Sequence, residues 1–201
     1  RDSTHTVREE LNEIRDHIYN LDDWAKAKLI RTYARAVFWT LSETYLDIAR
    51  SLLNEIKNNV LKVIAGAYVY SSLANTGPLC FNVDPCRELE VINQHLEDLR
   101  KQVSNSEDFL KNNPELEEYL RWSGLEKPEE TLDGKIKEAH SFALSGLGTC
   151  ALGRGELGKA IDYFNGAADI ARELRYWDNY LIGRSHAISV MALMDEDLEQ
   201  V

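Results

Sequence analysis

Hydrophobic residues recur every three or four positions along most of this chain, which is the period of an amphipathic α-helix. The first such stripe predicts a helix over about residues 6–20, and its members are Val7, Leu11, Ile14, Ile18 and Leu21. Runs of β-branched residues bounded by turn signals, which are typical of strands, are absent from the sequence, and only 4 residues are Pro. The pattern therefore predicts an all-α fold.

Three more helices are predicted in the first half of the chain. Asp22 and Asp23 can cap the second helix, which we expect to end near Trp39, and residues 40–43 (TLSE) have the form of a capping box that starts the third. The fourth is predicted from about residue 59 to residue 73. The Gly-Pro pair that follows at 77–78 is the signal that ends it. The apolar positions are Leu29, Ile30, Tyr33, Val37 and Phe38 in the second helix, Tyr45, Ile48, Ala49, Leu52, Leu53 and Ile56 in the third, and Ile64, Ala67, Tyr68 and Tyr70 in the fourth.

Proline signals divide the middle of the chain. Asp84 followed by Pro85 predicts the start of a helix to about residue 103, and Asn113 with Pro114 repeats the signal for a shorter helix ending near residue 124. Residues 124–131 are polar and contain Pro128, which predicts a linker or a bent connection. We expect a single helical domain over 1–201, with a subdivision into 1–78, 84–124 and 131–201.

Two helical stretches of similar length follow residue 142, separated by a glycine-containing turn at 153–155. Small residues lie where two antiparallel helices would cross closely, and larger ones lie on either side. This pattern resembles a single tetratricopeptide repeat, and the matching residues are Leu147, Gly148, Ala151, Gly155, Ala160, Phe164 and Ala167. A second, incomplete match begins at Ile182 and Gly183, close to one repeat length later.

The resemblance implies a right-handed stack of antiparallel helix pairs, or a helical bundle, that binds protein segments on its concave face. The corresponding partner-binding positions are Phe142, Ser145, Thr149, Tyr180 and Arg184. An aromatic residue and an Arg one turn apart are favoured at binding hot spots, which singles out the last two. Alternatively, Phe142 and Leu152 pack on the preceding helix that starts near residue 131.

Charge and cysteine usage limit the classes of partner and compartment. Asp and Glu number 34 against 23 Lys and Arg, a formal charge of −11 that repels nucleic acid. The longest apolar stretch, residues 60–73, is interrupted by Lys62 and is too short to span a membrane. Three cysteines without CxxC spacing argue against a disulfide framework and a zinc site, so we expect a reduced, cytoplasmic protein. Pairing of Cys80 with Cys86 across a short loop stays open.

One motif imitates a nucleotide-binding loop. Residues 153–159 satisfy the GxxxxGK spacing, but Ala160 stands where a hydroxyl would hold Mg²⁺, and the preceding segment has helical periodicity. We therefore expect no nucleotide, metal or other cofactor. Because the chain begins with Arg1 and not Met, we also expect it to be a fragment of a longer protein.

These patterns favour a non-catalytic interaction module or scaffold whose partner is a protein or peptide. A second hypothesis is an oligomerisation or regulatory domain of a larger signalling or transcription-regulating protein, in which case the chain would form homo-oligomers. A third is an enzyme with an unfamiliar helical active site, which would require a polar pocket joining His140 or His186 to a carboxylate such as Glu138.

Overall fold

The computed structural model describes residues 21–76, 84–103, 106–121 and 128–199. Each regular element in these ranges is an α-helix, which confirms the all-α prediction. The helices are α2 (Asp23–Thr40), α3 (Glu43–Glu55), α4 (Asn59–Thr76), α5 (Pro85–Gln102), α6 (Ser106–Lys111), α7 (Pro114–Arg121), α8 (Pro128–Gly153), α9 (Leu157–Glu173) and α10 (Trp177–Glu199). The helix predicted over residues 6–20 lies outside the described residues.

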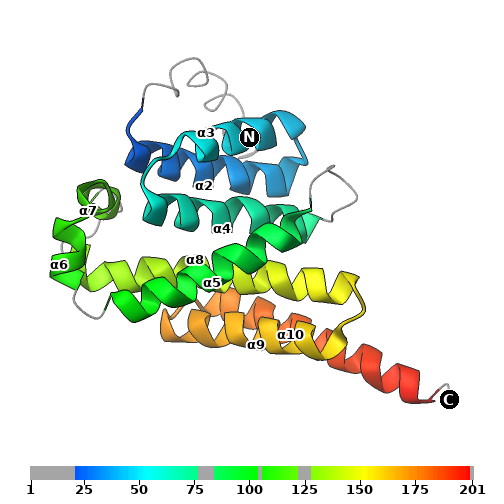
Figure 1. Cartoon of the computed structure of the whole chain (residues 1–201). Helices are drawn as coiled ribbons and strands as arrows, with labels where there is room; N and C mark the ends of the chain where they lie inside the picture. The colour runs from blue at the N-terminus through cyan, green and yellow to red at the C-terminus, as the bar shows by residue number, and fades with distance from the viewer. Residues whose placement is uncertain (1–20, 77–83, 104–105, 122–127, 200–201) are drawn as a thin grey trace, which may run out of the picture.

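The main helices form two layers (Figure 1). In one layer α2 packs beside α4, and α4 packs beside α8. In the other layer, α5 packs on both α4 and α8, α3 packs mainly on α2, and α9 packs between α8 and α10. Short turns join α2 to α3, α8 to α9 and α9 to α10, and each of these pairs packs closely, while α6 and α7 form a small insertion beside α8.

Local sequence signals explain some helix starts but not others. The Asp84 carboxylate accepts a hydrogen bond from the backbone N–H of Cys86 at 2.9 Å, which confirms the predicted cap of α5. The capping box predicted at residues 40–43 is wrong. Thr40 is the last residue of α2 and its hydroxyl donates to the Ala36 carbonyl at 2.7 Å, while Ser42 is the N-cap of α3 without a side-chain bond.

Burial follows the predicted stripes in α2 to α5, with one clear exception. Phe38, expected to face the core, is 42% exposed, although its neighbour Val37 in the last turn of α2 is buried. The predicted linker is also wrong at its C-terminal end, since Pro128 starts α8 in the manner of a first-turn proline. One continuous helix runs from there to Gly153, so the segment that starts near residue 131 is not a separate helix on which Phe142 and Leu152 could pack.

The close crossing of α8 and α9 is present as predicted. A Cβ added to Gly148 would lie 2.6 Å from Cε1 of Phe164, and Ala160 is fully buried. Gly155 has a φ of +73°, a left-handed conformation that favours glycine, and it makes the turn between the two helices. These residues carry the predicted helix pair.

A disulfide joins the two layers, which the cysteine count did not predict. Cys86 in the first turn of α5 is bonded to Cys150 in the last turn of α8, with their Cα atoms 5.7 Å apart. The expectation that the cysteines are reduced is therefore wrong for this pair. An odd number of cysteines does not exclude a disulfide, because two of the three can still pair. Cys86 is also not bonded to Cys80, which lies outside the described residues.

Candidate functional site

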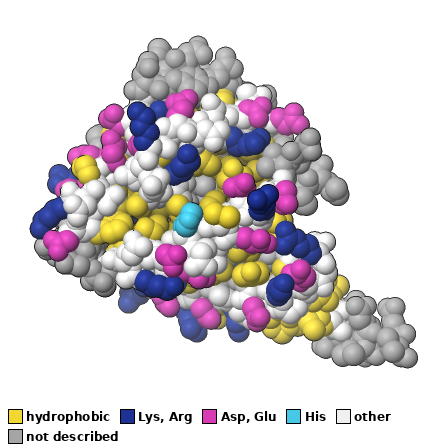
Figure 2. All heavy atoms as spheres, viewed as in Figure 1, with side chains coloured by type: hydrophobic (Ala, Val, Ile, Leu, Met, Phe, Trp, Pro, Cys, Tyr) yellow, Lys and Arg dark blue, Asp and Glu magenta, His cyan; other side chains and the backbone are white. Residues whose placement is uncertain are grey.

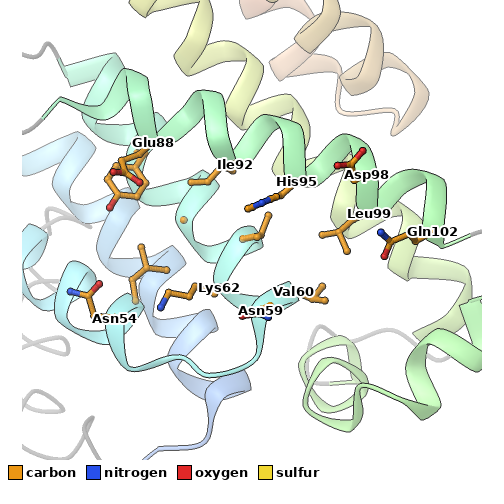
Figure 3. A pocket seen from close by; sticks show the side chains of 14 residues that line it. Asn54, Asn59, Val60, Lys62, Glu88, Ile92, His95, Asp98, Leu99 and Gln102 are labelled. Atoms are coloured by element: carbon orange, nitrogen blue, oxygen red, sulfur yellow. The ribbon is translucent and has the colours of Figure 1, made fainter.

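An open groove of about 620 Å³ lies between α3 and α5, with α4 as its floor (Figure 3). Hydrophobic side chains gather in a band across this face of the molecule, and charged side chains surround the band (Figure 2). The apolar lining is Leu53, Val60, Val63, Gly66, Ile92 and Leu99, and the other lining residues are Asn54, Asn59, Lys62, Tyr70, Glu88, His95, Asp98 and Gln102. The groove thus combines an apolar floor with a polar rim.

Packing of α4 against its neighbours creates the groove. Gly66 lets α5 approach closely, since an added Cβ would lie 2.9 Å from Cδ1 of Ile92. On the other side α3 packs mainly on α2 and makes fewer contacts with α4. One strip of α4, which includes the half-buried Val63, is therefore only partly covered by its two neighbours.

The turn from α3 to α4 fixes one end of the groove. The Asp23 carboxylate accepts hydrogen bonds from the backbone N–H groups of Lys57 and Asn58 at 2.8 and 2.7 Å. The Asn58 side chain in turn accepts from the N–H groups of Val60 and Leu61, each at 3.0 Å, and so caps the first turn of α4. These bonds hold Val60 at the groove wall.

The rim carries more negative than positive charge. The lining contains two carboxylates, Glu88 and Asp98, and one lysine, Lys62. Hydrogen bonds donated by Lys101 and Gln94 hold the pKa of Asp98 below its usual range, so this carboxylate stays ionised at neutral pH. The groove can therefore accept apolar side chains while its rim attracts cations.

A polar cluster ties α2 to α8 on another part of the molecule. The buried Glu138 carboxylate accepts hydrogen bonds from Arg31 and from Lys135, the latter at 2.8 Å. The Arg31 guanidinium also lies over the Tyr68 ring, 5.1 Å from its centroid. Burial raises the pKa of Tyr68 well above its ordinary value, and burial likewise raises the pKa of Tyr119 to about 12. The paired charges make this cluster an ionic link between helices.

The histidines considered for catalysis have other neighbours. Nδ1 of His140 lies 3.2 Å from Nη1 of Arg100, and burial, followed by the charge of Arg100, lowers the pKa of His140 to about 4. His186 packs edge-on against Phe164, with ring centroids 5.0 Å apart. Glu138 is bound by Arg31 and Lys135. In the described part of the chain, no group of three or more His, Cys, Asp or Glu residues could hold a metal ion.

The five residues predicted to bind a partner lie in two separate places. Phe142 packs edge-on against Tyr68, and the Thr149 hydroxyl donates to Asn75 at 2.8 Å, so these two residues lie where α8 meets α4. Ser145 lies on the same face of α8, between them in sequence, and is half-buried.

Tyr180 and Arg184 lie on α10, which packs on α9. Tyr180 contacts Trp177 edge-on, and Arg184 donates to the Asn165 side chain of α9. None of the five predicted residues lines the groove over α4.

Sequence reasoning missed the groove because its lining comes from three helices. One signal was available in α4, whose apolar residues surround nearly the whole helix. A helix of that kind is usually covered on all sides, so any uncovered strip becomes an apolar groove. Which strip stays open depends on Gly66 and on the position of α3, and neither can be derived from periodicity.

Comparisons with known proteins do not identify a family. No family model matches the chain, and no curated protein and no solved structure matches it. Within the described ranges, no helix has both the length and the apolar character needed to cross a bilayer.

Proposed function

We propose that this chain is a non-catalytic protein-interaction module that holds a short amphipathic segment of a partner protein in the groove over α4. The observation that carries this proposal is the apolar floor of the groove beneath a polar rim. The stacked antiparallel helix pairs support it, because they resemble tetratricopeptide-like scaffolds, whose task is to present such surfaces.

The shape of the groove favours a protein segment over a small molecule. Pockets for small ligands enclose most of the ligand surface. This groove is open to solvent along α4 and α5, and its apolar lining is spread between Val60 and Ile92. A helix or an extended peptide can place two or three apolar side chains there and keep its other face in water.

The charge of the rim indicates a basic partner segment. The whole chain has a formal charge of −11, and Glu88 and Asp98 flank the apolar floor. Complementary charges speed association and select against acidic competitors. We therefore expect apolar anchors flanked by Lys or Arg.

Peptide selection tests this proposal. A library of random peptides displayed on phage is panned against the wild-type protein, and binding to Val63→Gln measures the dependence on the groove. Val91→Gln is the matched control, because Val91 lies on α5, is 50% exposed and does not line the groove. Selected peptides should carry apolar anchors and net positive charge, and should bind Val63→Gln at least about tenfold more weakly than Val91→Gln.

Two results would contradict the proposal. The first is selected peptides that bind Val63→Gln as tightly as the wild type while circular dichroism shows both proteins folded. The second is selection of acidic peptides, or affinity unchanged by Glu88→Lys with Asp98→Lys. Either result would favour the alternative of an oligomerisation or regulatory domain.

The cytoplasmic location rests on the sequence argument, and the Cys86–Cys150 disulfide weighs against it. Cytosolic thiols are usually kept reduced, whereas disulfides persist in oxidising compartments. Mass spectrometry of the protein alkylated in its native cells decides between the two: alkylated Cys86 and Cys150 would support the cytoplasm, and a linked peptide pair would support an oxidising compartment.

A further inference from the structure

The Cys86–Cys150 disulfide lies next to one wall of the groove. Cys86 is in the first turn of α5, and Glu88 and Ile92 of the same helix line the groove (Figure 3). Cys150 is in the last turn of α8, and no described residue of α8 belongs to that lining. The bond therefore ties the α5 wall to a helix outside the groove.

Non-covalent contacts also hold the start of α5 in place. Leu89 is fully buried and packs so closely on α8 that a Cβ added to Gly146 would lie 2.7 Å from its Cδ1 atom. Arg154 of α8 forms an ion pair with Glu90 at 2.9 Å, but both side chains are exposed, and exposed pairs contribute little to stability. Without the disulfide, Leu89 would keep α5 on the body, while the turn before it would lose its tie to α8.

A small hollow of about 80 Å³ gives access to the disulfide. Its lining includes Cys150 and two ion pairs, Arg154 with Glu90 and Lys159 with Glu156. The volume is several times what a water molecule needs, so a thiol group fits. Because the charges balance within each pair, the hollow does not repel a thiolate, which is the attacking species in disulfide exchange. The partner cysteine is not part of the lining, so the sulfur of Cys150 is the point of attack.

We propose that this disulfide is a reversible redox site, that a dithiol reduces it, and that its reduction weakens binding in the groove by loosening the start of α5. One thiolate of the reductant bonds to the Cys150 sulfur, and the Cys86 sulfur leaves with the electron pair and takes up a proton. The second thiol of the reductant then displaces Cys150 from the mixed disulfide. The products are two cysteine thiols and the disulfide of the reductant. The effect on binding rests on the proposed function of the groove.

Loosening one wall should weaken binding without abolishing it. In the oxidised protein the first turn of α5 is already ordered, whereas in the reduced protein a ligand that contacts Glu88 must order this turn when it binds. Ordering on binding lowers affinity. Leu89 and Ile92 stay packed on α8 and α4, so the loss is confined to the start of the wall.

Redox titration of ligand binding tests the inference. The affinity of a peptide selected by panning is measured for the oxidised protein and for the same protein after reduction by dithiothreitol, both with Cys80→Ser so that no third cysteine exchanges. The reduced form should bind about three- to tenfold more weakly. Cys86→Ser with Cys150→Ser is the matched control, which should bind like the reduced form with or without dithiothreitol.

Backbone ¹⁵N relaxation of the free protein provides a readout that needs no ligand. Reduction should lower the order parameters of the amides of residues 86–91 and leave those of α3, the opposite wall, unchanged. Circular dichroism should show equal helix content in both redox states, because Leu89 remains buried. Loss of helix content on reduction, or a bond that dithiothreitol does not reduce in the folded protein, would overturn the inference.

The two readouts separate this inference from the proposed function. Equal order parameters of residues 86–91 in both redox states would overturn the inference, and so would equal affinities of the two states for a peptide whose binding depends on Val63. Peptides that bind Val63→Gln as tightly as the wild type would refute the proposed function, and with it the effect of reduction on binding. Relaxation would then still decide whether reduction loosens α5.

Discussion

Two regions of this protein build their cores from different residues. The body formed by α2 to α5 and most of α8 buries large aliphatic and aromatic side chains, such as Ile30, Tyr33, Leu61 and Leu96, in one continuous cluster. The C-terminal hairpin, formed by α9, α10 and the end of α8, buries Ala151, Ala160, Phe164, Ala187 and Val190. In the hairpin the helices are close because the residues between them are small, and the large apolar residues of α10 stay outside.

This contrast shows that apolar character alone does not locate a core. In the body, large side chains are buried because helices of two layers surround them. In the hairpin, Gly148 and Gly183 bring backbones so close that only small side chains fit between them, and Phe164 fills the remaining space. The consequence is an outer face on α10 that is apolar and uncovered, and that a second surface can bury.

Loss of the disulfide should have the largest effect on stability, because it joins α5 of the body to the end of α8, where the hairpin begins. The bond closes a loop between residues 64 positions apart, and loop closure of that length stabilises by about 4 kcal/mol. Cys86→Ser with Cys150→Ser should lower the free energy of unfolding in urea by about that amount. Cys80→Ser, which leaves the Cys86–Cys150 bond in place, is the control for the loss of a cysteine. A reduced wild-type protein that unfolds at the same urea concentration as the oxidised one would show that the bond does not form.

Gly148→Val should have the next largest effect and should act mainly on the hairpin. The added atoms clash with the Phe164 ring, and overpacking of this kind costs about 3 kcal/mol. Gly153→Ala in the same helix is the matched control: an added Cβ meets nothing within 4 Å, so stability should stay constant or rise slightly.

Hydrogen exchange should locate the damage of Gly148→Val. Amide protection should fall more in α9 and α10 than in α4, because the body has its own core. Uniform loss of protection through all helices would mean that the two regions unfold as one unit.

Acidification should destabilise the body through His140, with a smaller effect. The folded protein holds the pKa of His140 at about 4, below its unfolded value of about 6.5, so the unfolded chain binds more protons between these values. The stability due to neutral His140 is complete above pH 6.5 and is lost as the pH falls toward 4. Between pH 7 and 5 the loss should be about 2 kcal/mol. His140→Phe should flatten this part of the pH profile of urea unfolding, and an unchanged profile would assign the acid sensitivity to other groups.

The sequence predicted the positions of most described helices better than the contacts between distant helices, although α6 was not predicted. Local signals sufficed where they acted within one turn, as for Asp84 and Pro85 at the start of α5. The tight contact of Gly148 was predictable because its partner helix follows within a short turn. The Cys86–Cys150 bond and the groove were not, because both depend on how α4, α5 and α8 lie against each other across long stretches of chain. The polar residues 128–131 were misread because a first-turn proline and a linker proline have the same sequence signature.

The most direct test of the groove is an NMR titration of the isotope-labelled protein with a peptide selected by panning. The proposed function predicts amide shift changes at Val63, Gly66, Ile92 and His95, on the two sides of the groove. Changes confined to Phe142, Ser145 and Thr149, or to α10, would contradict it and would place partner binding on another surface.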